Sequence, residues 1–151
     1  MRPTDNADPR RLVNAPIKSP FNDYLGMQFF STADNGLEVR LPIRADLLNS
    51  AGIVHGGVYA SLGDVALSAA IYTRAAPLQV AITVEMSCRY LRAAREGVLC
   101  ALGRVVHLGN RIVVAEADIL VDGILQYTTS GTYTLMPRSP KGAVGHDQGA
   151  T

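Results

Sequence analysis

Long hydrophobic runs and a strong charge of either sign are missing from this 151-residue chain. No apolar stretch approaches the roughly 20 residues that a membrane-spanning helix needs. Charged side chains make up 18% of the sequence and the formal net charge is +1, unlike the basic surface of a nucleic-acid-binding protein. Residues 1–20 lack the continuous apolar core of a signal peptide. We therefore expect a cytoplasmic protein with neither nucleic acid nor membrane as a partner.

Cysteine is also scarce. Cys88 and Cys100 have no CxxC spacing, and no cluster of histidines accompanies them. This pattern argues against a zinc site, so we expect two reduced, buried thiols that act as small hydrophobic side chains. The sequence indicates no metal and no bound cofactor.

The chain is 48% hydrophobic, which is enough for one folded domain with a two-layer core. We expect a loosely held arm over residues 1–17, where three prolines stand, and a folded domain over residues 18–136. Residues 137–151 are rich in Gly, Pro and Ala, and we expect them to form a disordered tail.

Two local patterns precede the centre of the chain. A short helix is predicted to start at Pro20, with Ser19 as its N-cap, and to end at Gly26. Residues 27–43 are predicted to form a β-hairpin, because apolar and polar residues alternate there around Asp34-Asn35-Gly36. The Asn-Gly pair favours a type I′ turn.

The strongest helix pattern runs from Gly57 to about Thr73, where apolar residues recur at three- and four-residue spacings. The opposite stripe of this helix holds only small or polar residues: Gly57, Ala60, Ser61, Asp64 and Ser68. Such a stripe lines a cleft or meets a partner, whereas a freely solvated face more often carries Lys and Glu.

Four long strands are predicted to follow, over residues 80–90, 98–108, 112–121 and 124–136. Alternation places on one face of the first strand Val80, Ile82, Val84, Met86, Cys88 and Tyr90. In the third strand, the same alternation predicts that four residues point inward: Ala115, Ala117, Ile119 and Val121. One helix against a wide antiparallel sheet is an α+β fold, and the long strands offer edges for pairing between subunits.

One carboxylate interrupts the apolar helix. Between Asp46 and Arg74, the only acidic or basic side chains are His55 and Asp64. A buried carboxylate is costly unless it is paired or used, and a partly desolvated acid is what general-base chemistry requires. The competing interpretation is a helix carboxylate that pairs with an arginine or caps a neighbouring segment.

The residues around this acid have a specific spacing, Asn49-x-x-Gly52-x-x-His55-Gly56-Gly57, with Asp64 nine positions after His55. Shorter matches are Leu25-Gly26-Met27, Leu41-Pro42 and Arg89-Tyr90-Leu91. Over roughly residues 20–136 the chain resembles hotdog-fold acyl-CoA thioesterases, in particular the phenylacetyl-CoA (PaaI-like) subfamily.

The resemblance implies an antiparallel sheet wrapped around one central helix, and active sites at the interface of edge-to-edge homodimers that commonly pair into tetramers. It also implies an acyl-CoA substrate and no metal. Asp64 would activate water or attack the thioester directly, Thr83 would help to hold the water, and His55 would orient the thioester.

Chemistry suggests roles for the remaining residues. Gly57 would open the helix and leave its N–H free as an oxyanion donor, while Gly56 lets a substrate approach the backbone. Asn49 could donate a hydrogen bond or brace its loop. Further substrate-binding candidates are Ser68, Arg89 and Arg92, the arginines because coenzyme A carries phosphates. The other candidate arginines for these phosphates are Arg95, Arg104 and Arg111.

Helix geometry separates two of these groups. Gly57 and Asp64 are seven residues apart, which is about 10.5 Å of helical rise, whereas both must act within about 3 Å of one reacting centre. We therefore predict that Asp64 works with Gly57 of a neighbouring subunit.

Two rival functions stay open. A hotdog dehydratase or hydratase would pair a histidine with an acid in a different local motif. A non-catalytic acyl-CoA-binding protein would usually lack the helix acid and carry a DNA-binding extension. Structural roles also compete with the functional ones: a loop histidine for His55, a turn residue for Asn49, and a β-branched strand residue for Thr83.

Overall fold

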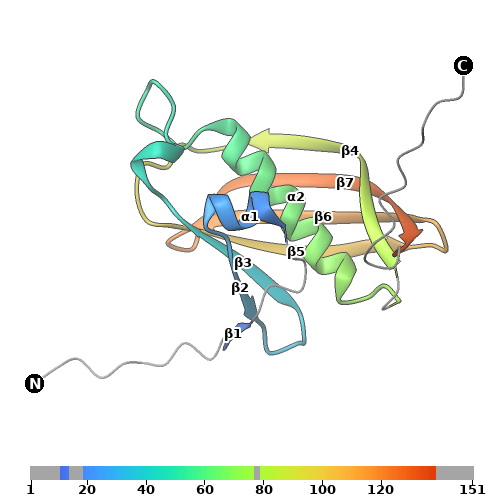
Figure 1. The fold of residues 1–151 in the computed structure, drawn as a ribbon. Helices are drawn as coiled ribbons and strands as arrows, with labels where there is room; N and C mark the ends of the chain where they lie inside the picture. The colour runs from blue at the N-terminus through green and yellow to red at the C-terminus, as the bar shows by residue number, and fades with distance from the viewer. Residues whose placement is uncertain (1–10, 14–18, 77–78, 139–151) are drawn as a thin grey trace, which may run out of the picture.

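Ten elements of regular structure are present in the computed structural model, which describes residues 11–13, 19–76 and 79–138. They are β1 (Arg11–Val13), α1 (Pro20–Leu25), β2 (Gln28–Ser31), β3 (Leu37–Pro42), a single 3-10 turn (Ala45–Leu47), α2 (Gly56–Tyr72), β4 (Gln79–Tyr90), β5 (Val98–Leu108), β6 (Ile112–Val121) and β7 (Ile124–Pro137). All strands join one antiparallel sheet in the order β1-β2-β3-β5-β6-β7-β4, and α2 lies across one face of it (Figure 1). This is the predicted α+β hotdog arrangement.

The predicted elements are confirmed to within one or two residues at most ends. The predicted arm, in contrast, contains structure, because Arg11–Val13 pairs with β2 as an edge strand. The rest of that arm, and residues 139–151 of the predicted tail, lie outside the described residues. β4 pairs with β7 and forms the edge of the sheet opposite β1.

The predicted type I′ turn between β2 and β3 is wrong. The Asn35 N–H donates to the Thr32 carbonyl at 3.2 Å, and the Thr32 N–H donates to the Gly36 carbonyl at 3.1 Å, so the loop has three residues. Asn35 has φ 60°, whereas Gly36 stays outside the left-handed region. A type I′ turn needs positive φ at two successive residues; here a tight turn followed by one left-handed Asn connects the strands.

The predicted alternation along β4 is correct only up to a bulge. The register of β4 against β7 shifts between Thr83 and Glu85, so Val84 is an extra residue. Thr83 lies opposite Tyr133, whereas Glu85 lies opposite Thr132. The bulge therefore places Ala81 and Thr83 on the same face as Met86, Cys88 and Tyr90. Strict alternation would have put the two groups on opposite faces.

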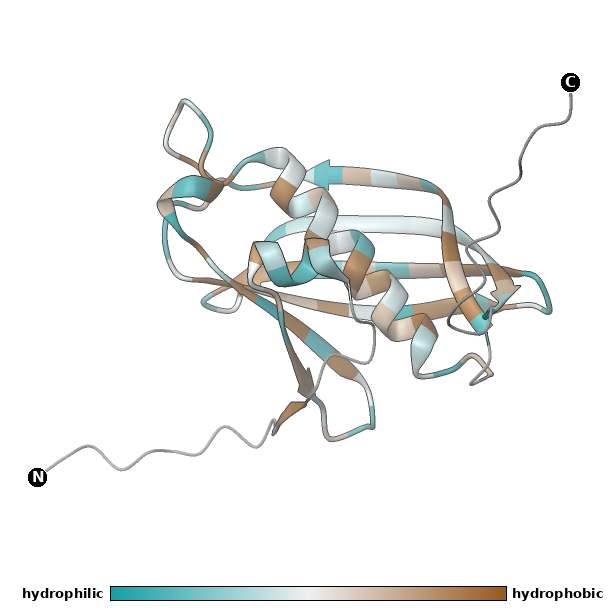
Figure 2. Cartoon of the chain, in the orientation of Figure 1, coloured by the Kyte–Doolittle hydropathy of each residue, from teal (hydrophilic) through white to brown (hydrophobic). Residues whose placement is uncertain are grey.

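The core lies between α2 and the sheet. Leu62, Ala66 and Ile71 of α2 have no exposed surface, and Figure 2 shows hydrophobic residues on α2 and on the strands behind it. A methyl group on Gly103 of β5 would lie 2.3 Å from the Ala66 carbonyl oxygen, so the close approach of helix and strand requires glycine there. The inward set predicted for β6 is confirmed: Ala115, Ala117, Ile119 and Val121 are all buried.

Both cysteines are free thiols, but each is half-buried, not fully buried as expected. Cys88 accepts a hydrogen bond from the Tyr127 hydroxyl, at 2.9 Å between oxygen and sulfur. Among the helices of the described segments, none combines the length and the apolar character needed to cross a bilayer.

Candidate active site

The loop before α2 is held by two side chains of the predicted motif. Asn49 Oδ1 accepts hydrogen bonds from the N–H groups of Ala51, at 2.9 Å, and Ile53, at 3.3 Å. These contacts are those of a residue that braces a turn. Of the two roles considered for Asn49, the structure shows the bracing of the loop.

His55 is the N-cap of α2, which begins at Gly56 and not, as predicted, at Gly57. Its imidazole Nδ1 accepts the Gly57 N–H at 2.8 Å. This contact corrects the prediction that the Gly57 N–H is unsatisfied, because an N-cap side chain supplies the partner that the first turn lacks. In this arrangement Nδ1 is the unprotonated nitrogen of the ring.

Asp64 lies two turns further along α2 and is half-buried. The Thr83 hydroxyl group donates to Asp64 Oδ1 at 2.8 Å, and the Tyr133 hydroxyl group donates to the same oxygen at 2.6 Å. Thr83 therefore contacts the carboxylate directly. Within the described segments no lysine, arginine or histidine forms an ion pair with Asp64, so the interpretation as a helix–arginine pair gains no support there.

Tyr133 is a site residue that the sequence analysis missed. It has no exposed surface, and burial, followed by the hydrogen bond to Asp64, raises the pKa of its phenol strongly. Hydroxyl interactions with Thr83 and Ser68 act on this pKa in the opposite direction. A signal was available: alternation from Tyr127 places Tyr133 on the inner face of β7, and a buried phenol needs a hydrogen-bond partner.

Three tyrosines pack together beside the start of α2. The rings of Tyr59 and Tyr127 are stacked with centroids 5.6 Å apart, and Tyr90 meets Tyr127 edge-on at 5.1 Å. The Tyr90 hydroxyl group donates to the Gly56 carbonyl at 3.1 Å, which ties the end of β4 to the first turn of α2. Burial is the main cause that raises the pKa values of Tyr59 and Tyr90.

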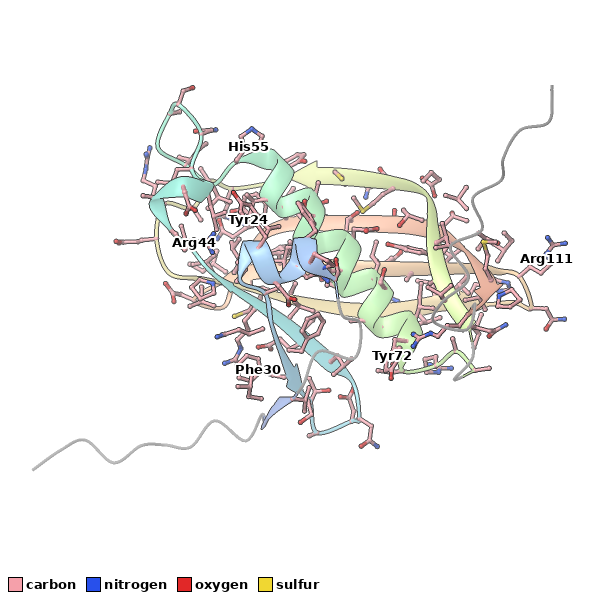
Figure 3. All side chains as sticks on the ribbon, viewed as in Figure 1. Tyr24, Phe30, Arg44, His55, Tyr72 and Arg111 are labelled. Atoms are coloured by element: carbon pink, nitrogen blue, oxygen red, sulfur yellow. The ribbon has the colours of Figure 1, made fainter. Side chains whose placement is uncertain are left out.

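A cleft of about 380 Å³ opens at this point. It is lined by Asn49 and Gly56 from the motif, by Tyr59 and Tyr90, and by Leu91 and Arg92 after β4, among others. A second, smaller cavity of about 80 Å³ lies further along α2, between Ser68, Tyr72 and Ala81. Figure 3 shows His55 and Tyr72 at opposite ends of α2. The small-residue stripe of the helix thus runs between two hollows.

The candidate arginines are not gathered at one place. Arg92 reaches the first cleft, although one of its nitrogens donates to the Leu125 carbonyl at 2.8 Å. Arg89 is exposed on β4 and does not line that cleft. Arg104 pairs with Glu116, and Figure 3 shows Arg111 at the far end of the sheet from His55. In the described parts of the chain, no group of three or more His, Cys, Asp or Glu side chains could hold a metal ion.

Comparisons with known proteins point to one family. The family model of the thioesterase superfamily matches residues 51–126, which contain all of α2 with Asp64, and the strands β4, β5 and β6. Among curated proteins, 1,4-dihydroxy-2-naphthoyl-CoA hydrolase of Escherichia coli is 28% identical over 107 residues, which cover 71% of this chain and 79% of the relative.

Solved structures show the same similarity. A conserved protein of Pseudomonas aeruginosa aligns with a TM-score of 0.75 and 32% identity, over 79% of this chain and 95% of the other. A protein of Bacillus halodurans, solved with CoA, aligns with a TM-score of 0.76 and 25% identity, over 83% of each chain.

Proposed function

Because the chain belongs to the thioesterase superfamily, we propose that it hydrolyses the thioester bond of an acyl-CoA and releases a free acid and coenzyme A. The observation that carries the proposal is the state of Asp64. Two hydroxyl groups fix one carboxylate oxygen, and no cation of the described segments neutralises the charge. A carboxylate that is oriented but not ion-paired suits a general base or a nucleophile.

Two routes lead to the same products. In one, Asp64 takes a proton from water as the water oxygen adds to the thioester carbonyl carbon. The carbon–sulfur bond then breaks, and the proton passes to the departing thiolate. In the other, the carboxylate attacks the carbonyl carbon and displaces the thiolate, and water cleaves the resulting anhydride to restore Asp64.

The Gly57 N–H is the proposed donor to the carbonyl oxygen, which becomes negatively charged in both routes. It lies at the positive end of α2, but His55 Nδ1 occupies it. The substrate oxygen must therefore replace the imidazole as the acceptor. This gives His55 a defined part: it holds the turn by accepting the Gly57 N–H and yields this donor when the thioester binds.

The site is proposed to lie between two chains. Gly57 and Asp64 are separated by about 10.5 Å of rise on one helix, so one chain does not bring both to a single carbonyl group. β4 carries Thr83 at an open sheet edge, and Ile82 and Val84 on it are 46% and 59% exposed. Pairing of β4 with its copy would cover this edge and give a homodimer, which could in turn pair into a tetramer.

Coenzyme A is proposed to enter by the cleft at the first turn of α2. Gly56 allows close approach of the thioester, and Arg92, together with the exposed Arg89, offers positive charge for phosphate groups. The acyl group would extend along the small-residue stripe that carries the acting Asp64, which belongs to the neighbouring subunit, toward Ser68. Aryl-acyl groups belong in the first substrate panel, since the Escherichia coli relative is named for an aryl-CoA and tyrosines line the cleft.

The test is a panel of aliphatic and aromatic acyl-CoAs, with thiol release as the readout. The wild-type chain should release thiol, and Asp64→Ala and Asp64→Asn should lose at least about a thousandfold in kcat, as expected when the base or nucleophile is removed. Thiol release from no acyl-CoA, or full activity of Asp64→Asn, contradicts the proposal.

The same panel separates the rival functions. Enoyl-CoA substrates that are hydrated without thiol release would indicate a hydratase. Acyl-CoA binding without any turnover would indicate a binding protein.

A further inference from the structure

We propose that Tyr133 is a positioning residue for Asp64. Its hydroxyl group and that of Thr83 fix one oxygen of the carboxylate, so that the other oxygen is presented to the substrate. The inference rests on the proposed thioesterase function. It adds a residue from β7 that lies 69 positions from Asp64 in the chain.

The geometry constrains the carboxylate. Tyr133 and Thr83 lie opposite each other on paired strands, and both donate to Asp64 Oδ1, at 2.6 Å and 2.8 Å. The last torsion of an aspartate is intrinsically broad. Two charge-assisted hydrogen bonds to the same oxygen restrict it and define the direction of the other oxygen, Oδ2.

The β4 bulge makes this arrangement possible. With Val84 as the extra residue, Thr83 faces the helix on the same side as Tyr133. Both hydrogen bonds found for the carboxylate in the described segments end on Oδ1. We therefore assign Oδ2 as the oxygen that takes the proton from water or attacks the thioester.

Tyr133 is the fixed member of the pair. It is fully buried, whereas Thr83 is exposed on the edge strand. Gly131 makes room for the ring, since a methyl group there would lie 3.2 Å from Tyr133 Cε2. Because burial raises the pKa of the phenol, Tyr133 stays protonated and remains a donor over the neutral pH range.

The first experiment compares Tyr133→Phe with Tyr127→Phe in the full chain. Tyr127 lies on the same strand, is equally buried, and donates to Cys88 Sγ instead of Asp64. We expect Tyr133→Phe to lower kcat about 10- to 100-fold with KM changed less than about twofold, because the carboxylate loses its orientation. Tyr127→Phe should keep kcat within about threefold, although both variants lose a buried hydroxyl group.

A second pair of variants keeps a small substituent at the para position of the ring and changes its ability to donate a hydrogen bond. Tyr133→4-aminophenylalanine restores a donor, whereas Tyr133→4-fluorophenylalanine has a substituent of similar size and no donor. The amino variant should have the higher kcat by about tenfold or more. This comparison stands even where the phenylalanine variant is too unstable to assay.

The outcomes separate this inference from the proposed function. If the wild type turns over an acyl-CoA, Asp64→Asn is inactive and Tyr133→Phe loses no more kcat than Tyr127→Phe, the role of Tyr133 is wrong and the thioesterase function stands. Equal kcat values for the amino and fluoro variants also overturn it. If no acyl-CoA is hydrolysed, the proposed function itself fails.

Discussion

At the scale of single residues, the motif divides into side chains that hold the backbone and one carboxylate that other side chains hold. Asn49 and His55 both accept hydrogen bonds from backbone N–H groups around the entry to α2. The Asp64 carboxylate accepts hydrogen bonds from the Thr83 and Tyr133 hydroxyl groups, and the Tyr133 hydroxyl group also approaches the Asp64 backbone carbonyl, at 3.2 Å. His55, which the resemblance implied to be an orienting residue, is the N-cap of α2 in this structure.

The contribution of the His55 cap to the free energy of unfolding should be measurable. Replacement of His55 by Ala removes the acceptor for the Gly57 N–H, and loss of an N-cap typically lowers the free energy of unfolding by about 1 kcal/mol. Urea unfolding at neutral pH measures this change. His107→Ala, an exposed histidine on β5, is the control and should stay within about 0.5 kcal/mol of the wild type. Equal stability of the two variants would show that the cap contributes nothing.

At the scale of elements, the distance between α2 and β5 is set by a missing side chain. Gly103→Ala places a methyl group against the Ala66 carbonyl, which has to move with the helix. We expect a loss of about 3 kcal/mol in the free energy of unfolding, measured in urea. Gly123→Asn is the control: nothing lies within 4 Å of its added Cβ, and Asn tolerates its φ of +75°. If Gly103→Ala leaves the free energy of unfolding unchanged, α2 can move away from β5 without cost and the prediction is wrong.

Two tyrosines of β7 should make the free energy of unfolding depend on pH in the alkaline range. Burial raises the pKa values of Tyr127 and Tyr133 above the ordinary 10.0, so the folded chain keeps both protons when the unfolded chain releases them. Their contribution is fully present below about pH 10 and is lost as pH rises further, by up to about 1.4 kcal/mol per pH unit for each phenol. Urea unfolding between about pH 8 and pH 11 measures this slope. The double variant Tyr127→Phe, Tyr133→Phe should show a shallower decline, and an unchanged slope contradicts the assignment.

At the scale of the whole molecule, the sheet order leaves β1 and β4 at its two edges. Only β4 is both long and a carrier of a proposed site residue, Thr83. The small-residue stripe of α2 runs beside the same edge. Assembly through β4 would therefore complete the site and protect the edge at once.

A charge on this edge should separate the subunits. Val84→Lys places a lysine at the most exposed apolar position of β4, and we expect a monomer with at least about a hundredfold lower thioesterase activity. Sedimentation analysis gives the mass, and thiol release gives the rate. Leu12 lies on the opposite edge strand and is 59% exposed, so Leu12→Lys should keep the mass of the assembly and the rate of thiol release. A fully active monomer contradicts the shared site.

Most of the fold could be predicted because it follows from short-range patterns. The three-to-four spacing fixed the extent of α2, and alternation with Gly and Asn at the turns fixed β5, β6 and β7. The β4 bulge could not be predicted, since its residues on both faces include β-branched and apolar types and its register is set by pairing with β7. The three-residue loop at Asn35 likewise depends on the twist of the two strands it joins.

The sequence by itself determined the architecture and the identity of the candidate acid, because periodicity and an isolated charge are properties of neighbouring residues. Only the tertiary structure decided how that acid is held. Thr83 is 19 residues and Tyr133 is 69 residues from Asp64, and both reach it through strand pairing and one extra residue in β4. Tertiary structure also decided that the Gly57 N–H is capped, since this depends on the rotamer of His55 and not on its position in the motif.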